Sequence, residues 1–166
     1  MLATIGYERS TPEDFIATLQ ARDIEVLVDI RERAQSRRRG FSKTALSLAV
    51  NEAGMEYVHF RALGDPKEGR EAARAGLIER FQKIFSEVLA AEPAQEALAE
   101  VELIARKKRI CLMCYERDHR YCHRRMVSDQ LERSLGCKVF HLGVANIETK
   151  NRYQGRVFHS RQGATA

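Results

Sequence analysis

The chain has 166 residues, of which 44% are hydrophobic and 31% charged, and its formal net charge is +5. This length favours one domain that buries about two thirds of the surface its unfolded chain exposes. No apolar run approaches the roughly 18 residues of a membrane-spanning helix, and the start MLATIGYERS lacks the features of a signal peptide. We therefore expect a cytoplasmic protein without a membrane partner, whose four cysteines are thiols or ligands rather than disulfides.

The first part of the chain predicts three strands and two helices. Residues 2–6 form a short apolar run, and a helix capped by Thr11 follows. Residues 25–30 contain three consecutive apolar residues, which is typical of a strand buried on both faces. The next helix opens at Ser42 and leads to a third strand at residues 55–60.

The second part predicts three helices and two further strands. Residues 61–75 combine turn residues with charge and lack periodicity, so we predict a loop near one edge of a site. Amphipathic helices are expected over 77–89 and about 94–107, and their apolar residues recur at helical spacing. Residues 109–114 predict the fourth strand, and a last helix precedes the fifth strand at 138–142.

Alternating strands and helices predict the α/β class: a single Rossmann-like domain with a mainly parallel five-stranded sheet and helices on both faces. We place this domain at residues 1–143 and a polar tail at 144–166. In such a fold, ligands bind at the carboxyl ends of the strands. The polar residues at those ends are Tyr7, Glu8, Asp29, Arg31, His59, Arg61, Cys114, Glu116 and His141. They predict one shared site.

Several short motifs resemble the family catalogued as domain of unknown function 488. The motifs are TIGYE, LVDIRE, FSK, a Leu-Gly pair, and CLMCYERDHRYCHRR followed by VFHL, and they span about residues 3–142. The resemblance implies a small Rossmann-like domain, while the family name assigns no activity. The family's motif positions carry over to Gly6, Asp29, Arg31, Ser36, Phe41, Cys114, Glu116, Cys122, His123 and Arg124. Members usually have proline where this chain has Ala34.

The cysteine-rich stretch at 111–125 has ligand types for zinc but not the usual spacing. Structural zinc takes four ligands, commonly in closely spaced pairs. Cys111 and Cys114 lie three residues apart in a predicted strand, so they point to opposite faces, and Cys111 belongs to the core. Cys114, Cys122, His119 and His123 remain as ligand types without a second pair. The sequence therefore assigns no metal, and the cofactor is unknown.

A thiol nucleophile is a second interpretation of the same stretch. Cys122 is predicted at a helix start, where the helix dipole and nearby arginines stabilise a thiolate, and Cys114 is an equal candidate. His123 or Glu116 would then carry a proton. The C-x5-R spacing from Cys114 to Arg120 matches cysteine phosphatases, but the intervening bulky and acidic residues disfavour that chemistry. The alternative is that both thiols only pack.

Arginines close to the predicted site favour a phosphate-bearing substrate. Residues 31–39 read RERAQSRRR, and guanidinium groups hold phosphate through paired donors. The acidic candidates either transfer protons or form structural ion pairs with Arg31 and Arg124, and both interpretations stay open. We predict an enzyme acting on a nucleotide or nucleic acid. Its catalytic candidates are Asp29, Cys114, Glu116, Cys122 and His123, and its substrate-binding candidates are Tyr7, Arg31, Ser36 and Arg124.

A nucleic-acid-binding protein without catalytic activity is the alternative function. The arginine loop, the basic residues 107–109 and the basic tail would form its surface, with Tyr153 and Phe158 stacking on bases. Such binding should weaken steeply with salt and survive loss of Glu116. Oligomeric state is not fixed by the sequence, although the 77–89 helix has enough apolar surface for a dimer.

Overall fold

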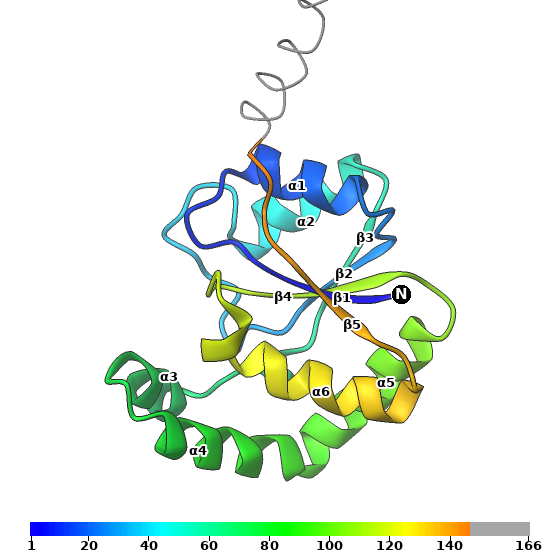
Figure 1. The fold of residues 1–166 in the computed structure, drawn as a ribbon. Coiled ribbons are helices and arrows are strands. Elements are labelled where there is room, and N and C mark those ends of the chain that lie inside the picture. The colour runs from blue at the N-terminus through cyan, green and yellow to red at the C-terminus, as the bar shows by residue number, and fades with distance from the viewer. Residues whose placement is uncertain (147–166) are drawn as a thin grey trace, which may run out of the picture.

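Five parallel strands form the centre of the molecule, in a computed structural model that describes residues 1–146 (Figure 1). The strands are β1 (Leu2–Gly6), β2 (Val26–Asp29), β3 (Glu56–His59), β4 (Ile110–Cys114) and β5 (Val139–Leu142). Their order in the sheet is β3-β2-β4-β1-β5, so β1 lies between two strands from the far end of the chain. The predicted parallel five-stranded sheet is confirmed. Most of the predicted tail, residues 147–166, lies outside the described residues.

Helices cover both faces of this sheet (Figure 1). On one face lie α1 (Pro12–Gln20) and α2 (Lys43–Glu52), while α4 (Ile78–Ala90), α5 (Glu92–Ala105) and α6 (His123–Leu135) lie on the other. As predicted, Thr11 caps α1: its hydroxyl oxygen accepts the backbone N–H of Asp14 at 3.1 Å. Between residues 1 and 146, no helix combines the length and apolar content that a membrane span requires.

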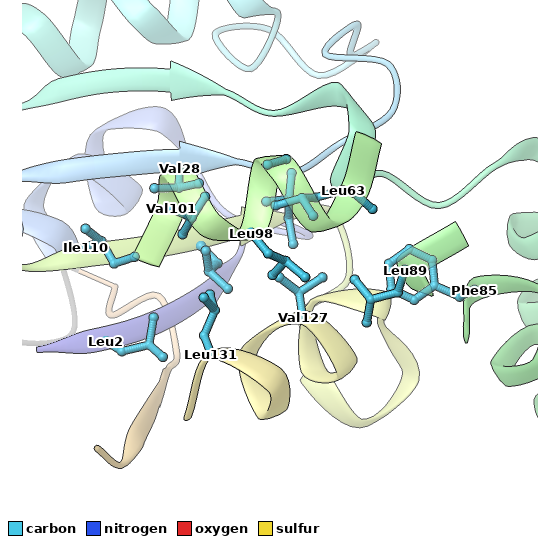
Figure 2. Close-up of a cluster of buried hydrophobic side chains, with 14 of the residues drawn as sticks. Leu2, Val28, Leu63, Phe85, Leu89, Leu98, Val101, Ile110, Val127 and Leu131 are labelled. Atoms are coloured by element: carbon cyan, nitrogen blue, oxygen red, sulfur yellow. The ribbon is translucent and has the colours of Figure 1, made fainter. Parts of the chain in front are cut away.

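Alternate residues of the strands divide between two cores. Leu2, Val28 and Ile110 belong to the larger core, to which α4, α5 and α6 contribute, α6 with Val127 and Leu131 (Figure 2). The residues in between pack against α1 and α2; they include Ala3, Ile5, Leu27, Cys111 and Met113. Because side chains alternate along a strand, the core position of Cys111 puts Cys114 on the face that α6 covers. The prediction that Cys111 is a core residue is confirmed.

Residues 61–75 are not the loop that the sequence predicts. They contain a 3-10 turn at Arg61–Leu63 and a helix, α3 (Lys67–Arg74), which lies beside α4. In α3 only Gly69 and Ala72 are buried, so the helix has almost no apolar stripe. Hydrophobic periodicity misses a helix of this kind because its buried face consists of small residues. A second 3-10 turn, His119–Tyr121, links β4 to α6.

Candidate functional site

A pocket of about 380 Å³ lies at the carboxyl ends of the neighbouring strands β1, β2 and β4. Its walls come from the segments that follow these strands, together with the start and end of α3. The lining residues are Tyr7, Arg31, Glu32, Arg33, Gln35, Ser36, Arg37, Arg38, Asp65, Arg70, Arg74, Cys114, Tyr115, Glu116 and His123. Six of the nine predicted site residues are among them: Tyr7, Arg31, Ser36, Cys114, Glu116 and His123.

The pocket wall is rich in arginine. The lining contains six arginines but only three carboxyl groups. Arg70 is committed to Glu32, with 2.5 Å between Nη1 and Oε2. Within residues 1–146, no ion pair involves Arg37 or Arg74, and the buried Nε–H of Arg38 lacks a hydrogen-bond partner. The wall therefore keeps guanidinium donors for an anionic ligand.

Arg31 is held rigidly by groups behind the pocket. Asp29 accepts from its Nε at 2.8 Å and from its Nη2 at 2.5 Å, while Nη1 donates to the Tyr7 hydroxyl and the Phe41 carbonyl. Burial opposes the charge of Arg31, but the hydrogen bonds and charge of Asp29 outweigh it and raise the pKa of Arg31. The hydroxyl of Tyr57 also donates to Asp29, at 2.5 Å. Asp29 is fully buried and does not line the pocket, so its contacts position Arg31.

Four reactive side chains form a cluster at the pocket floor, which we call the floor cluster: Cys114, Glu116, Cys122 and His123. The Cys114 thiol donates to Glu116 Oε2 at 3.2 Å. The Nδ1 of His123 lies 3.7 Å from the sulfur of Cys114 and 3.9 Å from that of Cys122. Both cysteines and His123 are buried, and Cys122 lies behind the other three rather than in the pocket lining. The fold thus unites a strand end, a loop and a helix start, as predicted.

The charges of the floor cluster are interdependent. The interaction with Cys122, followed by burial, raises the pKa of Cys114. Burial acts to raise the pKa of Cys122, but the interaction with Cys114 and the charge of His123 outweigh it and lower that pKa. Burial disfavours the charged imidazole, yet the negative Cys122 raises the pKa of His123 to about 9. Burial, reinforced by Cys122, raises the pKa of Glu116 to about 7.

Arg124 supports the loop that carries Glu116. Its guanidinium is almost fully buried and donates to the backbone carbonyls of Glu116 and Arg117. It does not line the pocket, so it positions the loop instead of reaching the ligand directly. Gly6 packs against the same loop: a Cβ at Gly6 would lie 1.8 Å from the Glu116 carbonyl oxygen. Only glycine allows β1 to approach the Glu116 backbone this closely.

Two predicted histidines lie away from the floor cluster, and one acidic residue was missed. His119 stacks on His141, with ring centroids 3.6 Å apart, and His141 contacts the Thr4 hydroxyl. Asp65, just before α3, lines the pocket, and its buried Oδ1 has no hydrogen-bond partner within the described residues. Burial raises the pKa of Asp65 to about 6. The Gly-Asp-Pro sequence at 64–66 could have drawn attention to Asp65, because Asp before Pro marks a turn.

Fold and site together define a small Rossmann-like α/β domain with an arginine-lined pocket above a cysteine- and histidine-containing floor. The family described as "Domain of unknown function DUF488" matches residues 11–131, and the chain belongs to this family. No curated protein matches the chain, and neither does any solved structure.

Proposed function

We propose that this protein is an enzyme that binds a phosphate-bearing substrate, a nucleotide or a nucleic-acid segment, in the arginine-lined pocket. The observation that carries the proposal is that Cys114, Glu116 and His123 line the same pocket as the arginine donors. A binding surface alone needs the arginines, but it does not need Cys114, Glu116 and His123 to meet beneath them. Clefts that combine anion-binding groups with buried ionisable groups are typical of catalytic sites.

The arginine donors set the substrate's position. Arg31 contributes positive charge and its one uncommitted Nη2–H, and because Asp29 already fixes the side chain, binding a phosphate requires little loss of its freedom. Arg37 from the loop after β2 and Arg74 from the end of α3 approach from other sides of the pocket. A phosphate held among them stands near the carboxylate of Glu116, which we propose transfers protons. Cys114 and His123 complete the reactive floor.

Noncatalytic nucleic-acid binding, the alternative function, has less support. Lys108 and Arg109 lie at the amino-terminal end of β4, opposite the pocket edge of the sheet. Lys108 pairs with Glu56, and Arg109 pairs with Asp23 at 3.0 Å. These residues therefore do not extend the arginine wall into one continuous surface. The basic tail, with Tyr153 and Phe158, lies outside the described residues.

The binding step is tested by titrating the protein with inorganic phosphate, AMP, ATP and a short single-stranded oligonucleotide, using calorimetry. We expect at least one probe to bind, and the double variant Arg37→Ala/Arg74→Ala to weaken it about 10-fold or more because charge-assisted hydrogen bonds are lost. Arg80→Ala is the matched control: Arg80 is exposed on α4, outside the pocket lining. Absence of binding by every probe, or an equal loss in the control, refutes the proposal.

The catalytic step is tested with the probe that binds best, by chromatography and mass spectrometry of the products. Glu116→Gln should abolish turnover while keeping the probe affinity within about threefold, since Glu116 is proposed to move protons rather than hold phosphate. If wild-type protein binds an oligonucleotide with steep salt dependence and converts none of the probes, the noncatalytic alternative is correct.

A further inference from the structure

Three atoms suited to a metal ion converge within the floor cluster. The sulfurs of Cys114 and Cys122 and a ring nitrogen of His123 all lie within 4.8 Å of one another. All three side chains are buried, so the cluster is not a chance grouping of exposed surface residues. Thiolate and imidazole are the donors that zinc prefers in proteins, and two sulfurs with one nitrogen is a known catalytic zinc set.

The spacing of these atoms matches a tetrahedral ion. Zinc–sulfur bonds of about 2.3 Å and zinc–nitrogen bonds of about 2.0 Å place sulfur and nitrogen ligands about 3.6 Å apart. The two sulfur–nitrogen distances are 3.7 Å for Cys114 and 3.9 Å for Cys122. These two distances are close to the edge length of the required tetrahedron. Binding then needs only small side-chain adjustments.

The second ring nitrogen of His123 provides an independent indication. His123 Nε2 lies 2.9 Å from the backbone carbonyl oxygen of Ile30. A carbonyl can only accept, so Nε2 must donate its hydrogen there, and loss of the Nδ1 proton then leaves a lone pair beside both sulfurs. Metal-binding histidines typically have this arrangement, in which a carbonyl or carboxylate fixes the tautomer from behind. Phe85 packs against the ring, with centroids 5.0 Å apart, and restricts its orientation.

We propose that Cys114, Cys122 and His123 bind one zinc ion, with the fourth coordination position open toward the arginine-lined pocket. Cys114 and His123 line that pocket, whereas Cys122 lies behind them. On binding, the thiols and the Nδ1 of His123 release their protons to solvent, so two thiolates balance the two positive charges of the ion and the imidazole ligand is neutral. The two cysteines then act as ligands rather than as a nucleophile. This goes beyond the proposed function, because phosphate binding by the arginines does not itself require a metal.

Metal binding is tested on reduced full-length protein, without reference to activity. We expect about one equivalent of bound zinc by elemental mass spectrometry. Cobalt replacing zinc should give a sulfur-to-cobalt charge-transfer absorption, which reports thiolate ligands. The variant Cys111→Ala/Cys137→Ser should retain both signals, since the floor-cluster thiols are then the only cysteines left. Because this variant leaves the floor cluster intact, a charge-transfer band in its spectrum assigns the thiolate ligands to Cys114 and Cys122.

Single variants then test each ligand. Cys114→Ser, Cys122→Ser and His123→Gln should each lower zinc affinity about 100-fold or more, while Glu116→Gln should keep the stoichiometry. Circular dichroism establishes that each variant is folded before titration. The metal proposal is overturned if reduced wild-type protein binds no zinc, or if the charge-transfer band is missing from Cys111→Ala/Cys137→Ser. If Glu116→Gln loses zinc, Glu116 is itself a ligand, and the proposal of an open fourth position is overturned. If the protein binds phosphate but the reduced wild type takes up no zinc, the metal proposal fails and the proposed function stands.

Discussion

Replacing Gly6 by alanine tests how tightly β1 supports the Glu116 loop. The new Cβ would lie 1.8 Å from the Glu116 carbonyl oxygen and 2.6 Å from its carbonyl carbon, and these backbone atoms cannot rotate away. Reaching even a tight contact of 3.0 Å requires the chain to move by about 1.2 Å. Overpacking of this size costs about 1–3 kcal/mol. The same carbonyl accepts from Arg124, and a weakened charged hydrogen bond adds about 1.5–3 kcal/mol.

We therefore expect Gly6→Ala to lower the free energy of unfolding by about 3 kcal/mol, after allowing about 0.5–1 kcal/mol for the better strand propensity of alanine. Urea denaturation followed by circular dichroism measures this quantity. Gly143→Ala is the matched control, because a Cβ at Gly143 meets nothing within 4 Å, and it should stay within about 0.5 kcal/mol of wild type. A Gly6→Ala value equally close to wild type would refute the argument.

Three further predictions concern residues around the site, each measured by urea denaturation. Asp29→Asn should lower the free energy of unfolding by about 3–5 kcal/mol because it leaves a buried guanidinium unpaired, whereas Tyr57→Phe should cost only about 1 kcal/mol; equal losses would contradict this. Phe85→Ala should cost about 3–5 kcal/mol, since the ring is fully buried. The folded pKa of Asp65, about 6, exceeds its ordinary 3.8, so the free energy of unfolding should fall as pH rises from about 4 to 6. Asp65→Asn should reduce that dependence, and an unchanged pH profile would show that Asp65 is not the group responsible.

The sheet is predictable from sequence because its strands are buried on both faces. Val26, Leu27 and Val28 give a continuous apolar run, and the structure assigns them alternately to two cores. The polar residues directly after such runs must gather at one edge, so Cys114 and Arg31 were found without knowing any contacts. The roles proposed for them remain predictions. What the sequence supplied was their location.

The missed features depend on packing that local patterns do not record. Helix α3 buries only Gly69 and Ala72, and its polar composition hid both the helix and the position of Asp65 beside it. The proposed zinc ligands were named as ligand types but not assigned a metal, for another reason: Cys114 and Cys122 are eight positions apart, and the 3-10 turn between them returns the chain to the same point. Spacing rules for zinc assume ligand pairs close in sequence. Here the fold brings Cys114 and Cys122 together.

The central position of β1 has a consequence for biosynthesis. Its partners, β4 and β5, begin at Ile110 and Val139, so β1 pairs with strands that are synthesised more than a hundred residues later. At about 5–20 residues per second, β1 stays unpaired for roughly 5–20 seconds of translation. Gly6 aligns with Cys114 in this register, so the pocket floor takes shape only when the two ends of the domain join. Truncated chains that stop before β4 should therefore be targets for chaperones and proteases.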